Sequence, residues 1–124
     1  MKENEKLKAI LKNDKEARYK FECILKDIAE KNVYFLEYVA PELLNNEQIM
    51  YYVVMKNGLA LQYASESLRD NESIVRQAIG QNYTALQYAS ERLQNDIEIL
   101  FKIASTGGFT YATDRIRKLL TTKK

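Results

Sequence analysis

One short phrase occurs twice in this chain, and it constrains the fold more than any other feature. The phrase ALQYASExL runs from Ala60 to Leu68 and again from Ala85 to Leu93, twenty-five residues later. Near-identical copies at a fixed period are typical of repeat proteins, in which each unit stacks on the next to complete a shared hydrophobic core. The sequence therefore predicts a stack of similar units.

Each unit is expected to contain two helices joined by a polar turn. In the first helix Leu61, Ala64 and Leu68 are spaced i, i+3, i+7, which places them on one buried face. The turn contains Asn71 in one unit and Asp96 in the next, and such side chains accept hydrogen bonds from the free amides that open a helix. We therefore expect the second helix to begin directly after these residues.

Certain residues within and between the units are unfavourable in a continuous helix. Pro41 stands where the other units have Glu66 and Glu91. Because proline inside a helix costs about 3 kcal/mol, the first helix of that unit is expected to end near Val39 or to restart there. Residues that tolerate the left-handed backbone are expected to end the second helices. They are Asn57-Gly58, Asn82 and Gly107-Gly108.

These patterns predict an all-α, single-domain α-solenoid made of stacked helical hairpins, with about eight or nine helices. Residues 1–32 are predicted to form an N-terminal helical cap. The repeats cover 33–57, 58–82 and 83–107, and residues 108–124 form a C-terminal capping helix.

The composition argues against catalysis and against bound metals or cofactors. The chain has no His and a single Cys, Cys23, which we interpret as a structural or incidental thiol. No glycine-rich phosphate loop or nucleophile elbow is present. Glu66 and Glu91 occupy the same position in successive units, whereas a catalytic carboxylate pair would be expected once. We therefore expect a protein that is not an enzyme and binds no cofactor.

The distribution of charge bears on partners and location. The N-terminal segment lacks the apolar run of a secretory signal, and no stretch approaches the ~20 apolar residues of a membrane span. A soluble, cytoplasmic protein is expected, one that is not exported by an N-terminal signal peptide. Residues 33–100 hold four Lys/Arg against nine Asp/Glu, while residues 101–124 hold six against one. The basic end could bind nucleic acid, but the acidic middle makes a continuous basic groove unfavourable. The candidate cations are Arg115, Arg117, Lys118, Lys123 and Lys124.

A tyrosine recurs at one position of every unit. Each of these side chains lies two positions after the core leucine, about 200° round a helix, so it cannot share the leucine's face. Packing between units explains a shared column, and a row of aromatic anchors for a partner is the alternative. The column consists of Tyr38, Tyr63, Tyr88 and Tyr111.

Residues that differ between units are better candidates for specificity. We predict a protein-binding surface whose anchors are Tyr51, Tyr52, Met55, Arg76 and Phe101. Its polar rim is predicted to be Gln62, Arg69, Gln87 and Arg92. The apolar breadth of the helices around Tyr51 and Phe101 has a second explanation, burial against another copy of the chain in a homodimer or larger homo-oligomer.

The phrase ALQYASExL, followed by two Asx residues and an apolar helix, resembles a family of short helical repeats known only as a domain of unknown function. Such repeats occur in large protist and viral proteins and in effectors of Legionella. The resemblance is close from Gly58 to Gly107, departs at Val39 and Pro41, and is weak or lost over residues 1–32.

The family as such implies no activity. A small, nearly stand-alone version of the repeat is similar to an effector that binds and inhibits a ubiquitin-directed deamidase and transglutaminase pair. That resemblance implies a bacterial effector, delivered into a host cell without an N-terminal signal peptide, whose partner is another effector enzyme of this class. One departure is that the end of the chain, RIRKLLTTKK, lacks the acidic cluster that many such secretion signals have.

Overall fold

The computed structural model describes residues 2–122, and the side chains of residues 5–121. This part of the chain contains nine α-helices, three 3₁₀-helices (labelled η) and no strand, so the predicted all-α repeat architecture is confirmed. In chain order the elements are α1 (Lys2–Asn13), α2 (Lys15–Asn32), η1 (Val33–Tyr38), α3 (Pro41–Leu44), α4 (Glu47–Lys56), η2 (Gly58–Tyr63), α5 (Glu66–Arg69), α6 (Glu72–Gln81), η3 (Tyr83–Tyr88), α7 (Glu91–Gln94), α8 (Ile97–Ser105) and α9 (Phe109–Thr122).

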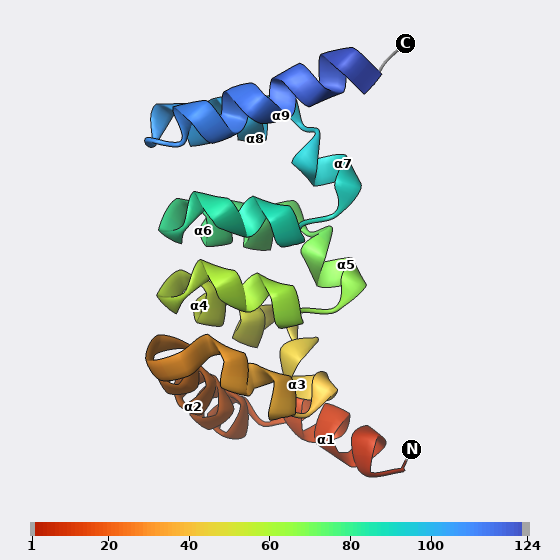
Figure 1. Ribbon diagram of the computed structural model, residues 1–124. Helices are drawn as coiled ribbons and strands as arrows, with labels where there is room; N and C mark the ends of the chain where they lie inside the picture. Colours follow the sequence, from red (N-terminus) through yellow and green to blue (C-terminus); the bar gives the residue numbers. More distant parts are fainter. Residues whose placement is uncertain (1, 123–124) are drawn as a thin grey trace.

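The elements form a stack with two layers and one connecting side (Figure 1). In that view η1, η2, η3 and α9 form the front layer, and α2, α4, α6 and α8 form the layer behind it. The short helices α3, α5 and α7 connect the layers along one side, which we call the corner side. A single apolar core runs through the stack, from Leu11 to Ala112.

The first half of each unit is two short segments, where we predicted one helix. After η2 the backbone is extended at Ala64, and the Ser65 hydroxyl then accepts a hydrogen bond from the amide of Leu68, at 3.3 Å, to open α5. Ser90 opens α7 in the same way. Ser side chains favour such N-cap positions because they satisfy an otherwise unpaired amide. The residues at i, i+3 and i+7, Leu61, Ala64 and Leu68, remain buried across the break.

Pro41 fits this broken pattern. The predicted interruption near Val39 is confirmed, because η1 ends at Tyr38 and α3 begins at Pro41. A proline at the first position of a helix loses no intrahelical hydrogen bond, since that amide has no partner there. Glu66 and Glu91 occupy the same first position in α5 and α7.

The predicted caps of the second helices are confirmed. The side chains of Asn46, Asn71 and Asp96 accept hydrogen bonds from the amides three residues ahead, at 2.9, 3.1 and 3.2 Å. Behind these caps, an apolar stripe of each second helix faces the core. In α6 it consists of Ile74, Val75, Ala78 and Ile79.

The predicted left-handed ends of the second helices are wrong at two of three places. Asn57 and Asn82 have extended backbone, with φ of −151° and −155°. Their side chains instead accept hydrogen bonds from the amides two residues ahead, at 3.0 Å, and so begin η2 and η3. Asn32 does the same for η1, at 3.1 Å. Among the described residues, only Gly107 has a positive φ, of 106°.

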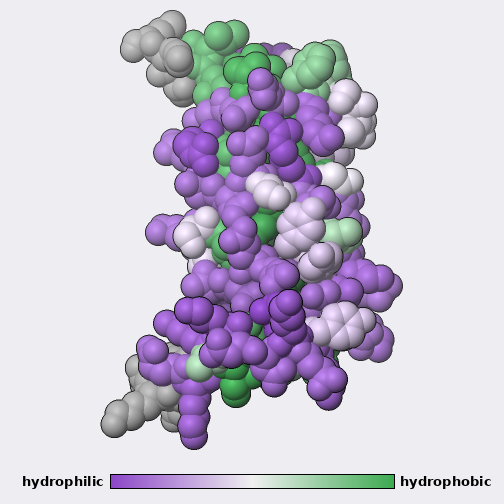
Figure 2. Space-filling model, turned by 180° about the vertical axis from the view of Figure 1, so that it is seen from behind, coloured by the Kyte–Doolittle hydropathy of each residue, from purple (hydrophilic) through white to green (hydrophobic). Residues whose placement is uncertain are grey.

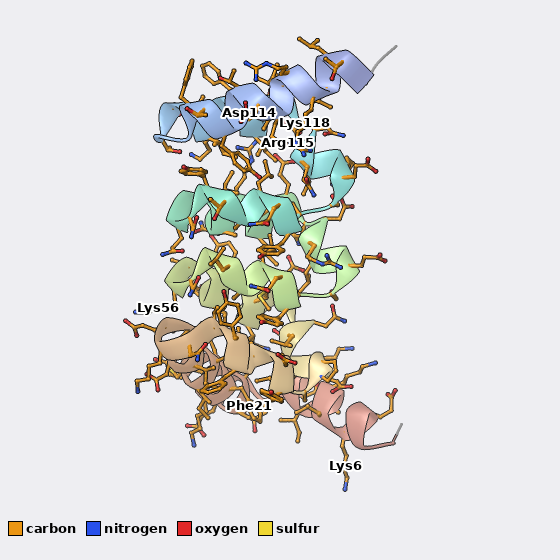
Figure 3. The ribbon with its side chains drawn as sticks, viewed as in Figure 1. Lys6, Phe21, Lys56, Asp114, Arg115 and Lys118 are labelled. Carbon is orange, nitrogen blue, oxygen red and sulfur yellow. The ribbon has the colours of Figure 1, made fainter. Side chains whose placement is uncertain are left out.

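Polar side chains also connect one unit to the next. The hydroxyl of Ser65 donates to Oδ1 of Asn45, and the hydroxyl of Ser90 donates to Oδ1 of Asp70 at 2.5 Å. On α9, Arg115 (labelled in Figure 3) completes the series by donating to Asn95 at 3.2 Å. The corner side is therefore held by equivalent contacts at each junction between units.

Candidate protein-binding surface

All five predicted anchor residues lie on the layer formed by α2, α4, α6 and α8. Tyr51, Tyr52 and Met55 belong to α4, Arg76 to α6 and Phe101 to α8. We call the solvent-facing side of this layer the back surface. Figure 2 shows it from outside, with pale side chains of intermediate hydropathy among hydrophilic ones and a hydrophobic area at the C-terminal end.

The anchors differ in how far a partner could reach them. The exposed fraction is 39% for Tyr52 and 76% for Phe101, and Met55 is exposed as well. Tyr51 is half-buried, and its hydroxyl accepts a hydrogen bond from Nε2 of Gln77 at 2.9 Å. This bond joins α4 to α6, so Tyr51 supports the stack as much as it lines the surface.

Arg76 is likewise engaged within the protein. Its Nε donates to Glu72 at 2.8 Å, and a terminal guanidinium nitrogen lies 3.9 Å from Glu98 on α8. The first contact is an ion pair one turn apart on α6, and the second reaches the next unit. At the positions equivalent to Glu72 and Arg76, α8 has Ile97 and Phe101, two exposed apolar side chains. At these two positions the back surface is therefore charged on α6 and apolar on α8.

Two shallow hollows meet at Tyr52, where α2 lies beside α4. The rings of Tyr51 and Tyr52 are edge-to-face, with centroids 5.2 Å apart, and Nζ of Lys26 lies 5.9 Å from the Tyr52 centroid. An exposed aromatic ring with a cation over its face can bind both apolar and polar groups of a partner. One hollow is lined by Glu47, Gln48, Tyr51 and Tyr52, and the other by Lys15, Arg18, Tyr19, Glu22, Lys26, Gln48 and Tyr52.

The α2 part of this surface was missed by the sequence prediction. Lys26 precedes Tyr51 by twenty-five residues, so it occupies the same position of the repeat as Tyr51, Arg76 and Phe101. The signal in the sequence is Asn32, which precedes Asn57 by the same interval and has the same capping role.

The structure does not bring the predicted polar rim together around the anchors. Gln62 and Gln87 lie on η2 and η3 in the front layer, and their side-chain amides donate to the backbone of their own segments at 3.1 Å. Arg69 and Arg92 lie on α5 and α7, on the corner side. The three segments of each unit face different directions, so residues adjacent in sequence are on separate surfaces.

Arg92 binds the preceding unit through Asp70. Its Nε donates to the Asp70 carboxylate at 3.0 Å, and its terminal nitrogen donates to the Asp70 carbonyl at the same distance. The hydrogen bond from the Ser90 hydroxyl, followed by that from Arg92, lowers the pKa of Asp70 below its ordinary value. A carboxylate with a lowered pKa stabilises the folded state above the unfolded-state pKa of about 3.9, and this contribution is lost as the pH falls through the folded-state pKa.

Arg92→Ala is therefore expected to raise the pKa of Asp70 toward the ordinary value, because one of its two charge-stabilising donors is removed. A titration followed by NMR of the side-chain carboxyl carbons measures this directly. Arg117→Ala is the matched control, since Arg117 pairs with Asp114 on α9, at 3.1 Å. An unchanged Asp70 pKa in the Arg92 variant would contradict the contact.

The tyrosines at the shared repeat position do not all behave alike: three pack between units, and one is exposed as an aromatic anchor would be. Tyr63, Tyr88 and Tyr111 are half-buried against the core, as packing between units requires, whereas Tyr38 is exposed. Burial raises the pKa of Tyr63, and the nearby charge of Glu37 raises it further.

No group of three His, Cys, Asp or Glu side chains that could hold a metal ion occurs among the residues with known placement. No helix between residues 2 and 122 is long and apolar enough to cross a membrane. Cys23, on α2, is half-buried.

Comparison with known proteins extends the resemblance seen in the sequence. Three segments match a family model described as Domain of unknown function (DUF4116): residues 22–69, 46–89 and 71–117. The first match includes the second half of α2 and the unit containing Pro41, which the sequence comparison had placed outside the close resemblance. No curated protein and no solved structure matches the chain. The matches run from residue 22 to residue 117 of 124, and the chain therefore belongs to the DUF4116 family.

Proposed function

We propose that this protein is a non-catalytic protein-binding module that contacts its partner through the back surface. The observation that supports this best is the exposure of Tyr52, Met55 and Phe101 on one layer of the stack. Large aromatic side chains are enriched among residues that dominate binding energy, and a rigid repeat stack holds them at fixed positions.

The partner we propose is another effector enzyme, and the effect of binding is its inhibition. This follows the resemblance to a small effector that inhibits a ubiquitin-directed deamidase and transglutaminase pair. A protein of this kind would act in a host cell. The back surface suits this role because it offers separate aromatic anchors, Tyr52 on α4 and Phe101 on α8, that can fill pockets of a larger protein.

The basic helix α9 gives less support to a nucleic-acid-binding function. Arg115 donates to Asn95, and Arg117 pairs with Asp114. These contacts occupy two of the cations on which binding to phosphates would depend, and Lys123 and Lys124 lie outside the described residues.

Tyr52→Ala and Phe101→Ala are each expected to weaken partner binding by more than ~1 kcal/mol, about fivefold or more in Kd. Affinity capture from the source cell identifies the partner, and calorimetry with purified proteins measures Kd. A deamidation or transglutamination assay on ubiquitin then tests inhibition. Phe35→Ala is the matched control, because Phe35 is 58% exposed but lies on η1 in the front layer. Folded Tyr52 and Phe101 variants that bind as tightly as the wild type would refute the proposal.

A further inference from the structure

Two hollows on the corner side are the same feature, repeated one unit apart. Each lies between the short helix of one unit and the serine that caps the short helix of the next. Ser65 lines the first hollow together with residues of α3, and Ser90 lines the second together with residues of α5. Glu42 of α3 and Glu66 of α5 therefore border successive hollows along the stack.

The carboxylates without partners gather at these hollows. Of the nine carboxylates in residues 33–100, five are engaged. Four of these form a hydrogen bond or an ion pair with another side chain: Glu47, Asp70, Glu72 and Glu98. The fifth, Asp96, caps α8. The other four have no hydrogen bond or ion pair with any residue in the described part of the chain, and all of them line the two hollows. They are Glu37 and Glu42 in the first, and Glu66 and Glu91 in the second.

Few cations line these two hollows, although Glu42 also borders a neighbouring hollow lined by Lys8, Lys12 and Arg18. Lys8 lines the first hollow and Arg69 the second, one cation against two unpaired carboxylates in each case. Asp70, also in the second hollow, is balanced by Arg92. Lys56, the one lysine of the acidic middle, projects from the opposite edge of the stack (Figure 3). The corner side is thus the negatively charged side of the middle units.

Apolar surface lies beside the carboxylates. Val39, Pro41, Leu44 and Tyr63 line the first hollow, and Ala89 lines the second. Lys and Arg side chains place their aliphatic stems on such surfaces while the charged group remains near carboxylates. Aromatic faces also attract these cations.

We propose that the corner side binds an extended, basic segment of a partner protein, with Lys or Arg side chains entering successive hollows. Packed helices lie about 8–10 Å apart, and an extended chain in the polyproline II conformation advances about 3.1 Å per residue, with every third side chain on the same face. Hollows that repeat once per unit therefore match basic residues about three positions apart. This site is separate from the back surface and has a different kind of occupant.

The test uses the full chain and a fluorescein-labelled peptide with lysine at every third position in a proline background, which holds the extended polyproline II conformation. Fluorescence anisotropy should show saturable binding with a Kd below about 1 mM that weakens as salt is added. The triple variant E42Q/E66Q/E91Q should weaken binding about tenfold or more. A peptide with glutamate in place of lysine should not bind.

The matched control is E47Q/E72Q/E98Q, which removes the same formal charge from the back layer. It should change Kd by less than about twofold, because these three carboxylates line neither hollow and already have partners, Asn71 for Glu47 and Arg76 for Glu72 and Glu98. Circular dichroism should show both variants folded. The proposal is overturned if the peptide shows no saturable binding, or if the two triple variants lose affinity equally, which would indicate attraction to overall charge rather than to the hollows.

Discussion

Replacing Leu93 by alanine is expected to lower the free energy of unfolding by about 2 to 5 kcal/mol. The Leu93 side chain is fully buried, at 0% exposure, and it is the one buried residue of the four-residue helix α7. A helix of this length has no stability of its own, because forming a single turn costs more conformational entropy than its hydrogen bonds return. Leu93 therefore both fills the core and holds the corner between η3 and α8 in place.

Urea unfolding followed by circular dichroism measures this loss. Leu120→Ala is the matched control, since Leu120 is 69% exposed on α9, and its removal should change stability by less than about 0.5 kcal/mol. Leu68 has the equivalent position in α5 and should behave like Leu93. If Leu93→Ala and Leu120→Ala had similar small effects, the corner helices could not be anchored by their leucines.

The sequence contained most of the repeat architecture because the same contacts recur at a fixed interval. The leucine positions and the Asx caps of the second helices could be identified by comparing units. The break within the first half of each unit was missed because Leu61 and Leu68 are buried whether the segment between them is one helix or two. Pro41 was the informative residue. It occupies the first position of the short helix α3, and every unit has such a short helix, so the break at Pro41 is not special to one unit.

The candidate surfaces could be predicted only in part. Comparing units placed Tyr51, Arg76 and Phe101 at one position, and the structure puts them on one layer. Glutamines and arginines close to them in sequence lie on other sides, because each unit turns twice within twenty-five residues. Which carboxylates remain unpaired could not be predicted, since Asp70 finds its partner Arg92 twenty-two residues away, in another unit.

Alanine substitutions at Gly58, on η2, and at Gly80, within α6, are expected to change the free energy of unfolding in opposite directions. At Gly58 a Cβ atom would lie 2.3 Å from the carbonyl oxygen of Ala78, a backbone atom of α6. The Gly58 amide also donates to Oε1 of Gln81 at 2.6 Å, so η2 cannot move away without losing this bond. Gly58→Ala should therefore lower the free energy of unfolding by about 1–3 kcal/mol, the usual cost of overpacking. Thermal and urea unfolding of the purified variant measure it.

Gly80→Ala is the matched control, with the same chemical change on α6 itself. No atom lies within 4 Å of the added Cβ, and Gly80 is exposed. Alanine there reduces the entropy of the unfolded chain without strain, so stability should rise by about 0.5–1 kcal/mol. Val33 and Tyr83 occupy the position of Gly58 in the neighbouring units, so the repeat as such accepts a side chain there. If Gly58→Ala left the free energy of unfolding unchanged, η2 and α6 would be less closely packed than the contact with Ala78 requires. A decrease seen for Gly58→Ala but not for Gly80→Ala would show that this junction requires glycine.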